Sequence, residues 1–349
     1  MTYTTINKCT SVHNSLNYTG NGSTNAKTGL GFQPDIVWNK NRGSTNNHVI
    51  HDSLRGVANR LQMGNNAQQD TSDAMASFDS DGFTMTGTGG GINGNTETYA
   101  TWCWKAGTTS GLSGGTITPT SYSINTTSKV GIYRYQGNGT AGASIAHGLG
   151  VVPACMWIKS EGANEDWILY HKKFNNGVDP EDYVLKIRAS SRTETNSAAY
   201  FNDTAHTSSL FYLGDDGGVN SNGTNYIAYV FGEVPGYSAF TQYHGNANAD
   251  GSFCYLGFAP KTLIICRRNS DDEIEIYDDN RLGYNPNTYH LNMNLNTAEA
   301  TLTGRLDLLS NGFKVRASSS GPLNASTQYL VMAWGQSLVG SNNVPCTAR

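Results

Sequence analysis

The sequence contains few charged residues. Asp, Glu, Lys and Arg make up 14% of the 349 residues, whereas an average soluble domain has about 25%. The formal net charge is −4 and the sequence pI is about 6.0, so the basic footprint of a nucleic-acid-binding protein is missing. We therefore expect no nucleic-acid partner. The residues that favour helix surfaces are also scarce, which argues against a helical protein.

The sequence also lacks apolar runs long enough to cross a membrane, and its first residues contain no apolar signal region. We expect no membrane insertion and synthesis in a cytoplasm. The cysteines are scattered and form no C-x-x-C pair. Cys103, Cys155 and Cys266 lie within apolar runs, where a free thiol behaves as a small hydrophobe. This cysteine usage favours a reduced compartment.

Turn-forming and aromatic residues take the place of the missing charge. The sequence has 40 Gly and 19 Tyr, together with many Asn, Ser and Thr. Glycine, asparagine and serine favour turns, whereas threonine and aromatic residues favour strands. The composition therefore predicts an all-β protein.

One pattern of residues occurs three times. Each copy opens with a Tyr-x-Gly-Asn motif, continues through a Leu-Gly pair to a proline and an apolar run, and ends with a tyrosine-led strand. The opening tyrosines are Tyr18, Tyr135 and Tyr243, the prolines are Pro34, Pro153 and Pro260, and the closing tyrosines are Tyr99, Tyr226 and Tyr329. A proline is tolerated at the first residue of a strand, so each apolar run is predicted to be a buried strand.

These landmarks predict three tandem antiparallel β-sandwich domains. The predicted repeats cover residues 1–107, 129–235 and 236–337. Residues 108–128 are rich in Gly, Ser and Thr and are predicted to form a linker, and residues 338–349 are predicted to be a polar tail that docks on a neighbour.

Two histidines, His48 and His51, followed by Asp52, suggest a metal or catalytic site. The repeats argue against it, because the positions that match His51 are Tyr170 and Tyr277. Residues three apart on a strand also point to opposite faces, whereas a zinc site needs three or four convergent ligands. We expect a planar ring at this strand position and no metal site.

A second metal hypothesis comes from Asp79-Ser80-Asp81-Gly82, which is similar to the first half of a calcium loop. The twelfth position of such a loop should be Glu, and here it is Gly90. A tight turn is the better interpretation. The remaining acidic clusters are predicted to be solvated loops; they are Asp215-Asp216, Asp271-Asp272-Glu273 and Asp278-Asp279.

Signatures of catalysis are missing. The sequence has no G-x-S-x-G elbow, phosphate loop or dinucleotide fingerprint. Paired carboxylates of a glycosidase meet in space, so their spacing in the sequence does not identify them. We predict no catalytic residues, no cofactor and no enzymatic activity.

The tryptophans divide into two groups. Four lie at repeated strand positions and are predicted to be core residues: Trp38, Trp104, Trp157 and Trp334. Trp102 and Trp167 alternate with other residues, so we predict that they are freer to face outward and are the candidate binding residues. Polar loop residues, which make adaptable hydrogen bonds, are further candidates for ligand contact.

The repeated motifs resemble a domain that recurs in the virion structural proteins of marine bacteriophages and cyanophages. The resemblance rests on the Tyr-x-Gly-Asn-Gly opening, the Gly-Leu-Gly-x-x-Pro strand entry, the Asn/Asp-Gly-Phe turn and the Tyr-x-x-x-x-Trp closing strand, and it covers nearly the whole chain. It implies a tail-fibre-like or other structural virion protein that is assembled in the host cytoplasm. The family supplies no catalytic residues.

We therefore expect a non-enzymatic protein of the virion surface, which is either a tail-fibre-like receptor-binding protein or a head decoration protein. The expected partners are other virion proteins of the capsid or tail and host-surface glycan. By analogy we expect a homo-oligomer, with a trimer as the usual state of fibres and decoration proteins. The alternatives are a polysaccharide depolymerase that acts on host-surface glycan and a free-standing lectin-like carbohydrate-binding module.

Overall fold

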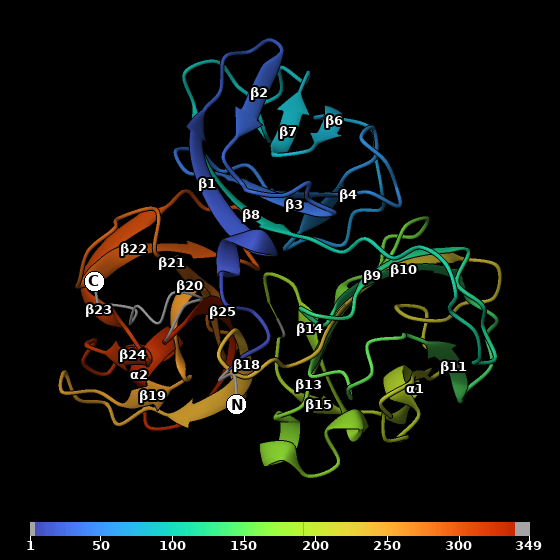
Figure 1. The fold of residues 1–349 in the computed structure, drawn as a ribbon. Helices are drawn as coiled ribbons and strands as arrows, with labels where there is room; N and C mark the ends of the chain where they lie inside the picture. Colours follow the sequence, from blue (N-terminus) through green and yellow to red (C-terminus); the bar gives the residue numbers. More distant parts are fainter. Residues whose placement is uncertain (1–3, 191, 339–349) are drawn as a thin grey trace.

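The computed structural model describes residues 4–190 and 192–338, and nearly all of its regular structure is strand (Figure 1). All pairings between its named strands are antiparallel. The prediction of an all-β protein is confirmed. The strands gather into three lobes, which we call the first lobe (4–107), the second lobe (108–235) and the third lobe (236–338).

The first lobe contains a five-stranded and a three-stranded sheet. The larger sheet has the order β1 (His13–Thr19), β8 (Thr98–Trp104), β3 (Ile36–Asn41), β4 (His48–Asp52) and β5 (Leu61–Met63). The smaller has the order β2 (Asn25–Thr28), β7 (Gly82–Met85) and β6 (Met75–Asp79), and the short helix η1 (Cys9–Ser11) precedes β1. Tyr18, Phe83 and Tyr99 are buried in one cluster that draws on both sheets.

The second lobe repeats this arrangement with additions. Its large sheet has the order β15 (Thr195–Asn196), β14 (Tyr183–Ile187), β13 (Trp167–His171), β12 (Cys155–Ser160), β17 (Asn225–Phe231), β10 (Val130–Gln136) and β9 (Ser121–Asn125). Its small sheet pairs β11 (Ala143–Ala146) with β16 (Leu210–Leu213). Its helical turns are η2 (Phe174–Gly177), η3 (Pro180–Asp182) and α1 (Ala198–Phe201).

In the third lobe the strands form one continuous sheet. The order is β18 (Ser238–His244), β25 (Gln328–Ser337), β20 (Phe258–Arg267), β21 (Glu275–Asp278), β22 (Asn287–Asn292), β23 (Ala300–Leu309), β24 (Gly312–Val315) and β19 (Phe253–Tyr255). The register shifts between β22 and β23, where the sheet passes into the part formed by β23, β24 and β19. The short helix α2 (Gly321–Asn324) precedes β25.

A run of five strands has the same order in all three lobes. The run is β1-β8-β3-β4-β5 in the first lobe, β10-β17-β12-β13-β14 in the second and β18-β25-β20-β21-β22 in the third. The register repeats too, because the closing-strand aromatics Trp104, Phe231 and Trp334 pair with the residue two positions after each repeated proline. Residues at equivalent positions of the three lobes can therefore be compared directly.

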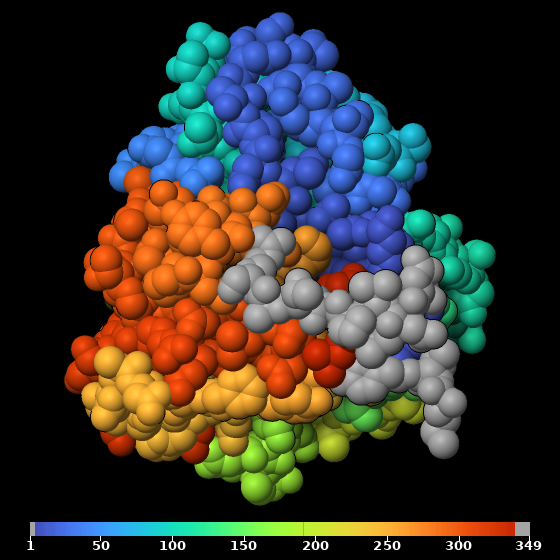
Figure 2. All heavy atoms as spheres, turned by 60° about the vertical axis from the view of Figure 1, so that its left-hand side comes forward, coloured from blue at the N-terminus to red at the C-terminus, as the bar shows by residue number. Residues whose placement is uncertain are grey.

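The three lobes share one apolar core. Each large sheet turns one face toward its own lobe and the other toward the remaining two lobes, as the core clusters indicate. The shared cluster includes stacked and edge-on aromatic rings, with centroid distances of 5.2 Å for Trp104–Trp334 and 5.0 Å for Trp157–Phe231. Aromatic pairs at this spacing add stability beyond the area that they bury. Figure 2 shows the first and third lobes in continuous contact over one face.

The segment 108–128 differs from the predicted linker. Residues 121–125 form β9, which pairs with β10, and Gly115 and Ile117 form bridges to Ile145 in β11. Ile117 and Ile124 are buried in the core of the second lobe. The Gly/Ser/Thr composition predicted flexibility, but the isolated isoleucines attach this segment to the sheet because each buries apolar surface. The predicted tail lies, except for Leu338, outside the described residues.

No helix among the described residues is long and apolar enough to cross a membrane.

Candidate functional site

Trp102 and Trp167 are not surface residues. Both side chains are 0% exposed, so the prediction that they face outward is wrong. The indole of Trp102 donates a hydrogen bond to Asp278 Oδ2 in the third lobe (3.2 Å), and that of Trp167 donates to the Gln62 carbonyl in the first lobe (2.7 Å). The face of each large sheet that points away from its own lobe packs on a neighbouring lobe. A ring on that face is therefore buried in the contact between lobes and is not exposed to solvent. These two residues join lobes and offer no surface for a ligand.

The four tryptophans predicted to be core residues are buried. Trp38, Trp104, Trp157 and Trp334 all belong to the core that the three lobes share.

His48 and His51 lie on opposite faces of β4. His48 Nδ1 accepts a hydrogen bond from the indole of Trp38 (3.0 Å), so its Nε2 carries the proton and donates to the Asn292 carbonyl of the third lobe (2.9 Å). His51 shares its register position with Tyr170 and Tyr277, as the repeats predicted. Burial lowers the pKa of His51 to about 3 and that of His48 well below its usual range. Both rings are therefore neutral structural groups.

The Asp79–Asp81 turn is a tight hairpin between β6 and β7, as predicted. Asp79 accepts hydrogen bonds from the hydroxyls of Ser77 (2.6 Å) and Thr84 (2.7 Å), and Asp81 accepts from the backbone N–H groups of Gly29 (3.0 Å) and Gly31 (2.6 Å). Asp79 therefore stabilises the hairpin itself, and Asp81 ties the turn to the strand-entry motif. Among the described residues no cluster of His, Cys, Asp and Glu is arranged to hold a metal ion.

Two acidic residues predicted to be solvated, Asp278 and Asp279, are buried. Asp278 is 1% exposed and forms an ion pair with Arg281 at 2.7 Å. The first lobe contains the same arrangement at the same register position, where Asp52 pairs with Arg55 at 2.6 Å. Burial alone would lower the pKa of Arg55, but the adjacent Asp52 outweighs burial and raises it. The Asp-x-x-Arg spacing is visible in the sequence, and its recurrence was the signal that could have identified these pairs.

Each lobe contacts the next through the loop that follows its β5, β14 or β22 strand. The backbone N–H at one loop position donates to the carbonyl just after the β3, β12 or β20 strand of the next lobe. The three bonds are Gln69 to Glu161 (3.0 Å), Glu194 to Arg268 (2.9 Å) and Glu299 to Arg42 (2.8 Å). The first lobe thus contacts the second, the second the third, and the third the first. A head-to-tail contact that recurs three times closes a ring.

We call these three contacts the joints 1/2, 2/3 and 3/1, after the lobes that they connect. An ion pair closes two of them. At joint 3/1 Glu299 pairs with Arg42 at 2.7 Å, and at joint 2/3 Glu194 pairs with Arg268 at 2.6 Å. The glutamate comes from the loop and the arginine from the strand end in both cases.

Joint 1/2 has a different pair of side chains. Gln69 stands in the loop position and Glu161 at the strand end, so the loop residue is neutral and the strand end is acidic instead of basic. Glu161 turns instead to Arg134 of its own lobe, which donates hydrogen bonds of 2.9, 3.0 and 2.8 Å to the carboxylate. The side chain of Glu161 is 5% exposed and that of Arg134 is 35% exposed.

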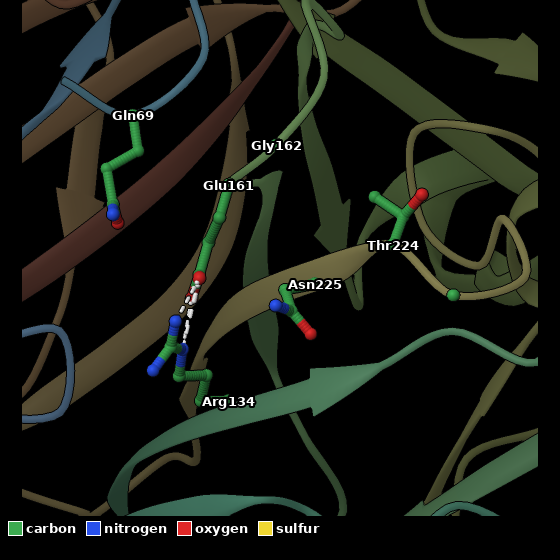
Figure 3. A pocket seen from close by; sticks show the side chains of 7 residues that line it. Gln69, Arg134, Glu161, Gly162, Thr224 and Asn225 are labelled. Carbon is green, nitrogen blue, oxygen red and sulfur yellow. Dashed lines mark hydrogen bonds and ion pairs between the residues drawn. The ribbon is translucent and has the colours of Figure 1, made fainter.

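A cavity of about 390 Å³ lies beside this joint (Figure 3). Figure 3 shows Gln69 approaching from the first lobe, with the remaining labelled residues contributed by the second. The lining residues are Gln69, Arg134, Glu161, Gly162, Gly223, Thr224 and Asn225. The sequence predicted none of them as a site, because the cavity arises from residues of two lobes and from a difference between joints.

The sequence model of a family described as a domain of unknown function, DUF7483, matches residues 8–337. No curated protein and no solved structure is significantly similar to the chain.

Proposed function

The chain belongs to the DUF7483 family, and from its geometry we propose that it is a non-enzymatic structural and binding protein of a bacteriophage virion surface. The proposal includes both locations that the sequence suggested, a tail-fibre-like receptor-binding position and a head decoration position. It also treats the lobes as three tandem copies of one β-sandwich unit.

The observation that carries the proposal is the closed ring of joints. Backbone hydrogen bonds connect each lobe to the next, partly buried ion pairs close two of the three joints, and the tryptophans fill the space between lobes. Buried polar groups with matched partners favour one rigid arrangement. A rigid body that uses its buried ionisable groups to join its own parts is suited to assembly and to holding surface loops in place.

The character of the surface agrees with a binding role. The loops between strands are rich in Asn, Ser, Thr and Gly, and the total charge is low. Such residues make adaptable hydrogen bonds to glycans or to neighbouring proteins. The proposed partners are other virion proteins and host-surface glycan. We propose that a homo-oligomer, such as a trimer, presents several copies of the body.

A reconstruction of the assembled particle tests the proposal. The density of the three-lobed body should occur at the capsid surface or on the tail, and immunogold labelling of intact particles should detect the chain at the same place. Purified particles that lack the chain would contradict the proposal.

Two other functions give different results in simple assays. A polysaccharide depolymerase would hydrolyse host capsule or lipopolysaccharide with a turnover that a single carboxylate substitution abolishes. A free-standing lectin-like module would bind glycan in the absence of any virion partner. We propose the structural role over both because the carboxylates of Glu299 and Glu194 at the joints, and that of Asp278 in its buried ion pair, accept hydrogen bonds from arginine side chains.

A further inference from the structure

We propose that the cavity at joint 1/2 binds a neutral sugar unit of a glycan. This inference rests on the proposed binding function and names its ligand class and site. It starts from the comparison of the three joints, because two are closed by an ion pair and the third leaves a cavity of about 390 Å³.

The exchange of side chains explains why the cavity is open. At joint 3/1 the Glu299 carboxylate fills the space next to Arg42 and also accepts from Arg281 at 3.0 Å. At joint 1/2 the matching loop residue is Gln69, whose Oε1 accepts from Arg55 at 3.4 Å. A glutamine does not attract Glu161 as a glutamate attracts an arginine, so the two side chains leave room between them (Figure 3).

The lining groups determine the class of ligand. Glu161 and Arg134 form an ion pair with no net charge, which disfavours both a simple cation and a simple anion. The amides of Gln69 and Asn225 and the hydroxyl of Thr224 add neutral donors and acceptors. In Figure 3 no hydrogen bond joins the Asn225 amide or the Thr224 hydroxyl to another of the lining residues drawn. A neutral ligand with many hydroxyl groups matches this set.

Glu161 is preorganised to accept such hydroxyls. Its carboxylate is nearly buried, and Arg134 holds it through two nitrogens. A carboxylate has about four acceptor positions, and the hydrogen bonds from Arg134 occupy three of them, so Glu161 can accept a sugar hydroxyl while it remains paired with arginine. The seven lining residues include no aromatic ring, so hydrogen bonds rather than stacking would provide the affinity. We expect a dissociation constant on the order of 1 mM for a single sugar unit.

Gly162 offers a way to block the cavity without disturbing the fold. A Cβ atom at this residue would meet no atom within 4 Å, and its backbone is outside the left-handed region. Gly43 is its counterpart in the first lobe, and a Cβ atom there would approach only the Asn41 side chain, at 3.9 Å. Gly43→Leu is therefore a matched control for Gly162→Leu, because it adds the same side chain at the same turn but away from the cavity.

The experiment is saturation-transfer NMR on the full chain. The probes are methyl glycosides of neutral hexoses and 6-deoxyhexoses, and methyl glucuronide and N-acetylneuraminic acid are the charged comparators. We expect at least one neutral glycoside to bind, Gly162→Leu to weaken it at least ~10-fold, and Gly43→Leu to leave it unchanged. Asn225→Ala, which removes only a side-chain amide, should weaken binding about 3- to 10-fold, and it replaces Gly162→Leu if that variant does not fold.

Several results would overturn the inference. The inference is wrong if no neutral glycoside binds or if only the charged comparators bind. It is also wrong if neither Gly162→Leu nor Asn225→Ala weakens the binding. These results leave the proposed function intact if the chain is found on particles. Sugar binding by a chain that is missing from particles would instead refute the virion role and retain the cavity as a sugar site.

Discussion

The hydroxyl of Tyr229 in the second lobe donates a buried hydrogen bond of 2.7 Å to Asp52 Oδ2 in the first lobe. Trp102 of the first lobe occupies the matching strand position and donates to Asp278 of the third lobe. At the remaining contact, His171 Nε2 lies 3.2 Å from the Val331 carbonyl. Asp52, His171 and Asp278 share one register position, and this position thus contacts a neighbouring lobe in all three lobes, with a different pair of chemical groups each time.

Removal of Asp52 should destabilise the whole protein. Asp52→Ala leaves Arg55 buried without its ion-pair partner, and we expect the free energy of unfolding to fall by about 3–5 kcal/mol. Denaturant titration followed by circular dichroism measures this change. The double variant Asp52→Leu/Arg55→Met removes both charges and should lose only about 1–3 kcal/mol, because the Tyr229 hydroxyl is then the unpaired group.

A partly exposed ion pair supplies the comparison for that prediction. Asp272 pairs with Arg267, and their side chains are 24% and 25% exposed. Asp272→Ala should therefore cost about 0–1 kcal/mol. If Asp52→Ala and Asp272→Ala proved equally mild, the burial of the Asp52–Arg55 ion pair would be refuted.

Tryptophan fluorescence should report a fully buried set of indoles. All six tryptophans are at most 1% exposed, so the native emission should be blue-shifted relative to the chain in guanidinium. Acrylamide should quench it weakly, because the rings are shielded from solvent. Replacing Trp102 or Trp167 with phenylalanine should leave sugar binding unchanged and lower stability by about 1–4 kcal/mol. Strong quenching of the native protein, reduced by either variant, would show that a ring is on the surface.

Stability should fall as the pH decreases below about 6. Burial lowers the pKa values of His13, His51, His171 and His206 to about 3, whereas an unfolded histidine titrates near 6.5. Between these values the unfolded chain binds protons that the folded chain does not. Each such histidine therefore contributes stability above pH ~6.5 that is lost by about 1.4 kcal/mol per pH unit as the pH falls toward 3.

His51→Tyr isolates one of these contributions. The other lobes have Tyr170 and Tyr277 at this position, so the variant should fold. It should reduce the slope of unfolding free energy against pH by about one proton between pH 4 and 6. Denaturant midpoints measured across this range check the slope, and an unchanged slope would mean that His51 is protonated in the folded protein.

The thiols of the folded chain should react slowly. Cys9, Cys103, Cys155, Cys254 and Cys266 are free and buried, and burial raises their pKa values, to about 12 for Cys254 and about 11 for Cys266. The thiolate is the reactive form, so at pH 8 Ellman's reagent should modify none of these five until the chain unfolds. Rapid reaction of several thiols under native conditions would contradict their burial.

Much of the local structure could be predicted from the sequence. The proline-led apolar runs became β3, β12 and β20, and the closing tyrosine-led runs became β8, β17 and β25. The internal comparison correctly placed His51 in a row with Tyr170 and Tyr277. These predictions succeeded because strand propensity, turn residues and spacing are local properties of the sequence, and the same local signals occur in each of the three repeats.

The errors concern residues whose surroundings only the tertiary structure supplies. The alternation along each strand predicts that Trp102 and Trp167 face outward, but a neighbouring lobe covers both rings. Arg281 folds back on Asp278 and buries it, which the run of acidic residues does not indicate. The segment 108–128 has the composition of a linker, yet Ile117 fixes it to Ile145 of β11. Alternation along a strand indicates on which face of the sheet a side chain lies, but it does not indicate what covers that face.

The sequence by itself determined that the chain is built from strands and that one pattern of residues recurs three times along it. The tertiary structure decided which lobe follows which around the ring, and that Gln69 and Glu161 meet where the other joints have an ion pair. These contacts join residues far apart in the chain, so they depend on the packing of whole sheets, which no short stretch of sequence encodes.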